Sequence, residues 1–111
     1  HPGFDIDSFE ADGTEDHRYI EVKTTISKQR IQLYGFRMSP NEWRVANTIK
    51  DHYYVYRLML SEKNKTLFIL RNPVQLYKDD LINAEAIYDD KKVVKYVVEK
   101  NGGNYEKGLW T

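Results

Sequence analysis

Four charged residues near the N-terminus have types and a spacing that could bind a metal ion. Asp5 and Asp7 are two positions apart, and so are Glu21 and Lys23. Residues two apart on an extended strand lie on the same face, so each pair would project from one side of its strand. Acids gathered on one face raise each other's pKa unless a cation compensates. A hard divalent cation with oxygen ligands is the obvious compensator, and Lys23 is the other source of positive charge.

The elements that must position these residues are two strands joined by a turn, within residues 3–25. Asp12-Gly13 is a strong hairpin signal between the two strands. Apolar residues alternate with the charged ones, so we expect one apolar face and one charged face. The alternating apolar residues are Phe4, Ile6, Ile20 and Val22. For Asp5 and Glu21 to share a face, the numbers of paired residues must sum to an even value, unless a β-bulge corrects the parity.

An ordered set of motifs between residues 3 and 75 resembles a known family. The motifs are GFDI (3–6), IEVK (20–23), SPNEW (39–43) and YYVYR (53–57). Together they resemble the "protein NO VEIN" C-terminal domain family, which is often attached to helicases and restriction systems. More broadly, Asp followed by Glu-x-Lys resembles the PD-(D/E)XK nuclease superfamily.

This resemblance implies an α/β (α+β) fold with a restriction-endonuclease-like mixed β-sheet flanked by helices. The superfamily usually has a helix before the aspartate strand, and that helix often supplies another acid. Because the sequence begins with His1-Pro2, we expect that helix to be missing. We expect residues 1–111 to be a single domain of a longer protein, in keeping with common domain sizes of ~100–150 residues.

The same resemblance implies the chemistry of the site. Asp5 and Glu21 would be carboxylate ligands of Mg²⁺, with Mn²⁺ as a substitute, and the backbone carbonyl of Val22 would be a further ligand. Mg²⁺ keeps several waters, so two carboxylates suffice. Lys23 would position or help to deprotonate the attacking water and would stabilise charge on the phosphoryl group. We therefore expect a Mg²⁺-dependent endonuclease acting on DNA, within a restriction, defence or helicase-associated protein.

Three alternatives stay open. The same fold could be a catalytically inactive module that binds nucleic acid or protein. The domain could also be a small interaction module with no nucleic-acid role. At the level of the residues, Glu21 and Lys23 could form a weak pair on a solvated strand face.

Charge is unevenly distributed along a chain whose net charge is zero. Residues 1–25 hold seven acids and two bases, residues 26–75 three acids and nine bases, and residues 76–111 seven acids and six bases. A neutral chain argues against strong non-specific nucleic-acid binding, but an acidic metal site followed by a basic segment suits a nuclease. Charged residues that simply cover a solvated surface would give the same pattern. The candidate phosphate contacts are Lys28, Arg30, Arg37 and Arg44.

Several other residues have two interpretations. Asp7 has the parity of Asp5 and could be a second ligand. Glu42 could reach the site, although a helix-capping role explains it fully. Arg57 could pair with an acid. The tyrosines at 53, 54 and 56 could stack on bases, although strand tyrosines are more often half-buried core. The histidines at 17 and 52 lack the spacing of a zinc site.

The composition also limits the setting of the protein. There is no cysteine, which excludes disulfides and thiolate metal sites and is compatible with a reducing cytoplasm. No apolar run approaches the ~18 residues needed to span a membrane, and there is no signal peptide. We expect a cytoplasmic protein with no membrane partner. Whether it forms a dimer, and whether DNA or RNA is its substrate, stay open.

The rest of the chain predicts a mixed set of elements. A helix should begin at Ser39, with Pro40 in its first turn and Glu42 completing a capping box, and run to about residue 49 with Trp43 against the sheet. Strands are expected over residues 53–60, 66–71 and 92–100, with a shorter third strand containing Ile31, Leu33 and Phe36. Residues 73–77 suggest one turn and residues 79–86 a helix. Residues 101–104 suggest a break.

Overall fold

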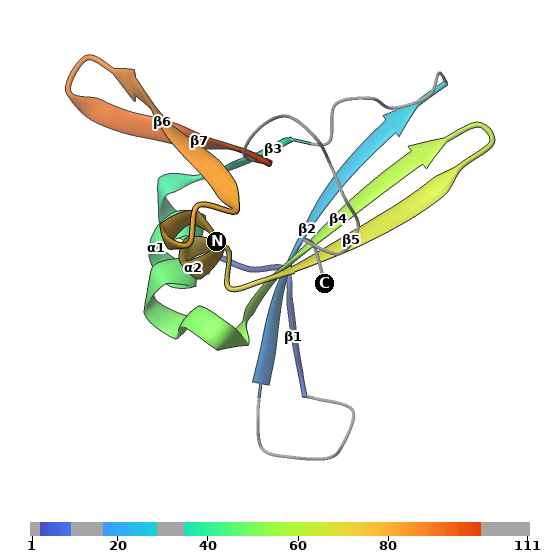
Figure 1. Ribbon diagram of the computed structural model, residues 1–111, viewed down its shortest axis with the longest axis horizontal. Coiled ribbons are helices and arrows are strands. Elements are labelled where there is room, and N and C mark those ends of the chain that lie inside the picture. The colour runs from blue at the N-terminus through green and yellow to red at the C-terminus, as the bar shows by residue number, and fades with distance from the viewer. Residues whose placement is uncertain (1–2, 10–16, 29–34, 101–111) are drawn as a thin grey trace.

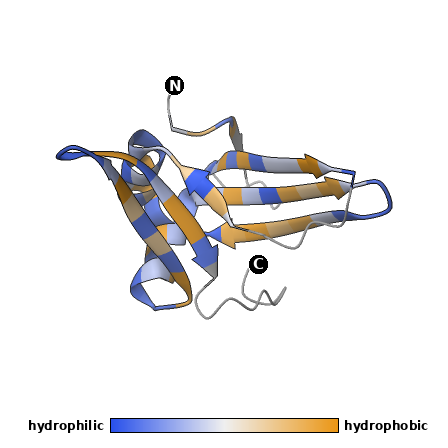
Figure 2. Ribbon diagram, turned by 90° about the horizontal axis from the view of Figure 1, so that it is seen from above, coloured by the Kyte–Doolittle hydropathy of each residue, from blue (hydrophilic) through white to orange (hydrophobic). Residues whose placement is uncertain are grey.

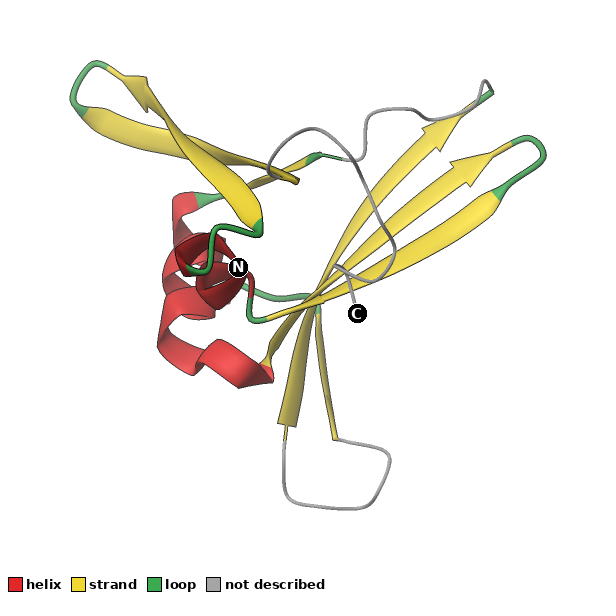
Figure 3. Cartoon of the chain, viewed as in Figure 1, coloured by secondary structure: helices red, strands yellow, loops and turns green. Residues whose placement is uncertain are grey.

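Strands make up most of the structure, and they form two small sheets. The computed structural model describes residues 3–9, 17–28 and 35–100 (Figure 1). A four-stranded sheet has the order β1 (Ile6–Phe9), β2 (His17–Ser27), β4 (Tyr53–Ser61) and β5 (Lys65–Arg71). A three-stranded sheet has the order β3 (Phe36–Met38), β7 (Lys92–Lys100) and β6 (Ile82–Asp89). In the described residues the helices are α1 (Pro40–Ile49), α2 (Pro73–Lys78) and a single 3₁₀ turn, η1 (Lys50–His52). This is a mixed α+β domain (Figure 3).

The four-stranded sheet combines both kinds of strand pairing. β1 runs antiparallel to β2, with registers from Ile6 opposite Ile20 to Phe9 opposite His17, so paired numbers sum to an even value as predicted. The turn at Asp12-Gly13 lies outside the described residues. β2 and β4 are parallel, and the chain returns between them through β3, α1 and η1, because parallel neighbours need a crossover connection. β4 and β5 form the predicted hairpin. At its turn, the N–H of Ser61 donates a hydrogen bond to the carbonyl of Asn64 at 2.8 Å.

Helix α1 begins where local chemistry predicts. The N–H of Glu42 donates to Ser39 Oγ at 3.0 Å, and the N–H of Ser39 donates to Glu42 Oε1 at 2.7 Å, which completes the capping box. Ala46 is fully buried, and Trp43 stacks on Tyr96 of β7 with ring centroids 5.0 Å apart. The start, the end and the packing of Trp43 against a sheet are therefore confirmed, and the sheet it meets is the three-stranded one.

Residues 79–86 are not helical, and this prediction was wrong. Residues 82–89 form strand β6, which pairs antiparallel with β7 along its whole length. Ile82 is buried and its neighbour Asn83 exposed, an alternation that fits a strand covered on one side. Asp90, with φ of +58°, turns the chain between the two strands. The strand at 92–100 was predicted correctly. Of the short third strand only β3 is described, because Ile31 and Leu33 lie outside the described residues.

The core fills the space between the four-stranded sheet and a second layer made of α1, α2 and the three-stranded sheet. On β4 and β5 it takes alternate residues, namely Tyr53, Val55, Met59, Phe68 and Leu70. From the second layer come Phe36, Met38, Ala46, Val74, Ile82 and Val98. The far halves of β2, β4 and β5 extend beyond this layer (Figure 1). None of the helices in the described residues has the length and apolar character needed to cross a membrane.

The register decides which face of β2 looks into the core, and it is the charged one of the two predicted faces. Glu21 pairs with Val55 and Lys23 with Arg57, so both charged residues share the inner face with core residues of β4. Ile20 and Val22 share the outer face with Tyr54 and Tyr56. Apolar side chains remain exposed on that outer face, including Ile6, Ile26 and Leu67. Figure 2 shows how hydrophobic and hydrophilic residues alternate along the strands.

Candidate functional site

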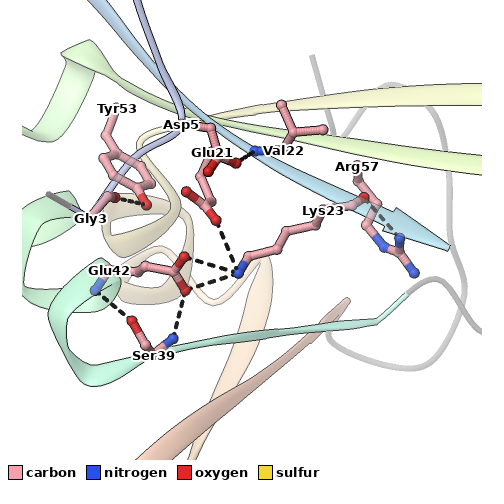
Figure 4. A network of polar contacts seen from close by, with 9 residues as sticks. All are labelled: Gly3, Asp5, Glu21, Val22, Lys23, Ser39, Glu42, Tyr53 and Arg57. Atoms are coloured by element: carbon pink, nitrogen blue, oxygen red, sulfur yellow. Dashed lines mark hydrogen bonds and ion pairs between the residues drawn. The ribbon is translucent and has the colours of Figure 1, made fainter. Parts of the chain in front are cut away.

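Asp5 lies just before β1, at the place where the β1–β2 ladder ends. Its N–H donates to the carbonyl of Ile20 at 2.8 Å, and its carboxylate Oδ2 accepts the N–H of Val22 at 2.8 Å (Figure 4). The carboxylate thus continues the hydrogen bonding of β2 beyond the last strand pair. N–H and C=O of one extended residue point to the same side of a strand, so the carbonyl of Val22 faces this same edge.

Gly3 holds the chain that leads to Asp5 close against helix α1. Its φ is +86°, and a Cβ at this position would lie 2.6 Å from Cγ2 of Val45. Its carbonyl accepts the hydroxyl of the fully buried Tyr53 at 2.8 Å. Burial, together with the negative charge of the nearby carboxylates, raises the pKa of Tyr53, so its hydroxyl stays a proton donor. Only glycine fits this position without displacing the helix.

Glu21 is a carboxyl group inside the protein, with 4% of its surface exposed. Burial raises its pKa to about 8, and the neighbouring carboxylates of Glu42 and Asp5 add to the rise, while Lys23 opposes it. Glu21 Oε1 lies 3.3 Å from Lys23 Nζ. Its other oxygen, Oε2, is buried and has no hydrogen-bond partner within the described residues. A buried oxygen in this state is costly, which makes it a candidate position for a water, a proton or an ion.

Lys23 joins the two layers of the protein. Its Nζ lies 2.9 Å from Oε1 and 3.1 Å from Oε2 of Glu42 in α1, and it contacts Glu21 on its own strand (Figure 4). Helix α1 therefore faces the acid–lysine cluster, defined here as Asp5, Glu21, Lys23 and Glu42. The interpretation of Glu21 and Lys23 as a weak pair on a solvated face is wrong, because Glu21 is buried and its lysine partner is held from both sides.

Glu42 caps the helix as the sequence predicts, and its side chain also reaches the site. It completes the capping box, and its carboxylate is part of the cluster with only 6% of the residue exposed. Burial opposes its ionisation, but hydrogen bonds with Glu21, Ser39 and Lys23 hold the pKa of Glu42 below its usual value. The capping motif by itself explains Glu42, so nothing in the sequence showed that its side chain also reaches Lys23.

A pocket of about 280 Å³ opens next to Lys23, between β2 and β3. Besides the lysine, the residues that line it are Thr24, Thr25, Gly35, Phe36, Arg37 and Arg57. Arg57 is buried and fixes this wall, donating to the carbonyls of Lys23 at 3.0 Å and Gly35 at 3.1 Å and to Thr25 Oγ1 at 2.7 Å. Arg37 lies on β3 and is exposed, so it contributes an accessible positive charge to this pocket.

The four basic residues proposed as phosphate contacts do not gather in one place. Arg37 lies beside Lys23 in the pocket, whereas Arg44 is exposed on α1 and bonds Asn41. Lys28 lies past the far end of β2, by another pocket whose walls include Ile26 and Leu60. Arg30 lies outside the described residues. Of this set, the structure places Arg37 in the pocket that Lys23 also lines.

The remaining candidates are placed as follows. Asp7 lies in β1 opposite Tyr19 of β2, and the structure does not describe the Asp7 side chain. His52 is exposed, and its ring contacts the carbonyl of His17. Tyr53 and Tyr54 are buried, which favours their role in packing over base stacking. Among the residues described, no three His, Cys, Asp or Glu side chains gather in a way that could hold a metal ion by themselves.

The fold and the cluster together define a class: a mixed α+β domain in which Asp5 precedes one strand and Glu-x-Lys lies on the next. The chain belongs to the family described as "Protein NO VEIN, C-terminal", whose match covers residues 1–70. "Protein NO VEIN" of Arabidopsis thaliana is 33% identical to it over 61 residues, which are 55% of this chain and 2% of that protein. The family expected from the motifs is thus confirmed, and the chain spans a small fraction of that relative's length. The solved structures contain no match to this chain.

Proposed function

We propose that this domain is a divalent-cation-dependent nuclease with a restriction-endonuclease-like fold of the PD-(D/E)XK kind. It would cut phosphodiester bonds of DNA within a larger restriction, defence or helicase-associated protein. The observation that carries the proposal is the meeting of Asp5, Glu21 and Lys23 at one edge of a mixed sheet. The crossover from β2 through α1 to a parallel β4 is compatible with that fold.

The residues present fit a small, hard cation. Glu21 Oε2 is buried without a hydrogen-bond partner among the described residues, and the Val22 carbonyl faces the edge that holds the Asp5 carboxylate. Mg²⁺, or Mn²⁺ in its place, prefers oxygen ligands and keeps several waters, so two carboxylates and a carbonyl are enough. When bound, the cation would supply a water of lowered pKa and positive charge for the phosphoryl oxygens.

Lys23 would act on the substrate from the protein's side. It is fixed by Glu42 and Glu21, and it also lines the pocket that contains Arg37. An ammonium has three donors, so a phosphate oxygen or water that lies next to it can share them with the carboxylates. A preorganised positive charge at a reacting phosphate typically contributes on the order of 10²–10³ in rate.

The alternative is an inactive module that uses the same surface to bind nucleic acid or protein. The observation that favours it is the ion pair between Lys23 and Glu42, which gives the lysine a counter-charge without any metal or substrate. A neutral total charge also limits non-specific attraction to nucleic acid.

Cleavage of supercoiled plasmid and of single-stranded DNA and RNA, with Mg²⁺ and with Mn²⁺, tests the proposal. We expect nicking that chelation abolishes, that Lys23→Ala reduces by about 10²–10³-fold, and that Asp5→Ala reduces with partial rescue by more Mg²⁺. Arg37→Ala should weaken binding and make its salt dependence shallower, whereas Lys28→Ala is the matched control outside the pocket. Absence of cleavage, with DNA binding retained, would leave the inactive module. Loss of both activities would exclude a nucleic-acid role.

A further inference from the structure

The carboxylate of Glu42 takes part both in the cap of helix α1 and in the acid–lysine cluster. On one side, its Oε1 accepts the Ser39 N–H at 2.7 Å and closes the helix cap. On the other side, both of its oxygens contact Lys23 Nζ, at 2.9 and 3.1 Å. The start of helix α1 and the lysine of the cluster are therefore held by the same group.

A capping role alone does not require this arrangement. The capping box needs one side-chain oxygen at this position, and glutamine supplies it as well as glutamate does. Glu42 adds a second oxygen and a negative charge, and both face the ammonium of Lys23 rather than water. Keeping a charge inside the protein is costly unless it is paired, so the geometry of the pair is closely fixed.

The contacts also hold the ammonium of Lys23 from two sides. Glu42 holds the ammonium from the helix side and Glu21 Oε1 holds it from the strand side, at 3.3 Å. Lys23 lines the pocket with Arg37 as well. An ammonium carries three N–H donors, and the two carboxylates present three oxygens to them, so the contacts hold the ammonium in one orientation (Figure 4).

We propose that Glu42 is the positioning residue for Lys23, and that helix α1 thereby supplies an acid essential to the site from a segment that follows the lysine in the chain. The proposal rests on the proposed nuclease function for its effect on cleavage. Its structural half, that the charge of Glu42 immobilises the Lys23 ammonium, is independent of that function. Glu42 touches neither substrate nor metal in this proposal and acts through the lysine.

Glu42→Gln tests this, because it keeps the capping oxygen and the shape but removes the charge. Ser39→Ala is the opposite change, since it removes the hydroxyl half of the cap and leaves the carboxylate in place. Glu85→Gln, on an exposed position of β6, controls for the loss of one negative charge. Circular dichroism checks folding. If Glu42→Gln does not fold, Glu42→Asp, which keeps the charge but reaches less far, is tested in the same way.

The first readout is the side-chain ammonium signal of Lys23 in ¹H–¹⁵N spectra of the 111-residue chain, assigned by its loss in Lys23→Ala. A lysine held by carboxylates exchanges its protons slowly enough to be seen. We expect the signal in the wild type, in Ser39→Ala and in Glu85→Gln, and its loss in Glu42→Gln. Persistence of the signal in Glu42→Gln would overturn the proposal whatever the cleavage results are.

The second readout is plasmid nicking with Mg²⁺ or Mn²⁺. Misplacing a catalytic group by about 1 Å can cost ~10²-fold, so we expect Glu42→Gln to lower kcat by that order with little change in KM. In a double variant with Lys23→Ala, Glu42→Gln should have no further effect on kcat. Ser39→Ala should lower Tm by about 4–8 °C with kcat unchanged. Normal kcat in Glu42→Gln would overturn the role in the reaction. If the wild type does not cleave, the nuclease proposal fails, and the ammonium signal still decides whether Glu42 positions Lys23.

Discussion

The two faces of the four-stranded sheet differ in a way that alternation along the strands does not reveal. The inner face of β2 carries Glu21 and Lys23, yet it is the face that helix α1 covers. The outer face carries apolar residues, yet Ile26 there is 78% exposed and Leu67 is 49% exposed. The protein has thus enclosed polar groups that are costly to bury and left apolar groups in solvent. Natural proteins depart from the usual distribution of polar and apolar groups mainly at functional or strained sites, which makes the inner face the candidate site of the domain.

The largest effect should come from removing the positive charge of the inner face. Lys23→Met leaves Glu42 buried without a counter-charge, which typically costs about 3–5 kcal/mol of unfolding free energy. Lys28 is an exposed lysine just past the same strand. Lys28→Met should change the unfolding free energy by less than about 0.5 kcal/mol. Chemical denaturation at pH 7 measures both. Equal losses from the two variants would mean that the cluster is solvated and the comparison of faces incorrect.

The next effect compares two leucines of β5 on opposite faces. Leu70→Ala removes a fully buried side chain from the core and should cost about 2–5 kcal/mol. Leu67→Ala removes one that is 49% exposed on the outer face, and we expect about 1 kcal/mol or less. The same denaturation experiment separates them. A cost at Leu67 that matches the cost at Leu70 would show that the outer face is covered in solution.

The pH dependence of stability should report the buried acid of the inner face. Glu21 has an ordinary pKa of 4.5 and a folded value of about 8. Between these values the folded protein holds a proton that the unfolded chain has released, so stability falls as pH rises, by at most ~1.4 kcal/mol per pH unit. Glu42 has the opposite sign, because its pKa is lowered, and its contribution is lost as pH falls through the acid range.

Melting curves with a chelator present, from pH 4 to 9, test this dependence. Glu21→Gln should flatten the fall in stability between about pH 5 and 8, since the titrating group facing Lys23, Glu42 and Asp5 is gone. Glu85→Gln, at an exposed site, is the control. A wild-type stability that rises across this interval would contradict the assignment of Glu21 as the proton-holding acid.

The smallest effect should come from the outer face. Ile26→Thr keeps the branched shape that suits a strand and makes an exposed residue polar, so Tm should hardly change, corresponding to less than about 0.5 kcal/mol. Sedimentation velocity run beside the melts shows whether self-association changes. A marked loss of stability would mean that a second copy or another segment packs on this face.

Much of the local structure was predictable because its causes lie within a few residues. Ser39 and Glu42 satisfy each other's backbone N–H groups, so the start of α1 could be predicted from four consecutive residues. The β4–β5 hairpin could be predicted in the same way, from two runs of β-forming residues with a polar turn between them. The helix prediction failed for residues 79–86, where Ile82 and Ala84 alternate with Asn83 and Glu85, but alanine is a weak strand former and pairing with β7 provides the stabilisation.

The sequence by itself determined that Asp5, Glu21 and Lys23 lie on neighbouring strands, that no thiolate chemistry is available, and which family the chain belongs to. Only the tertiary structure decided which face of β2 is enclosed and that Glu42 meets Lys23, 19 positions earlier in the chain. The physical reason is that alternation specifies two faces but not which one is covered. That choice depends on the parallel pairing of β2 with β4 and on where the crossover places α1, and both are long-range interactions.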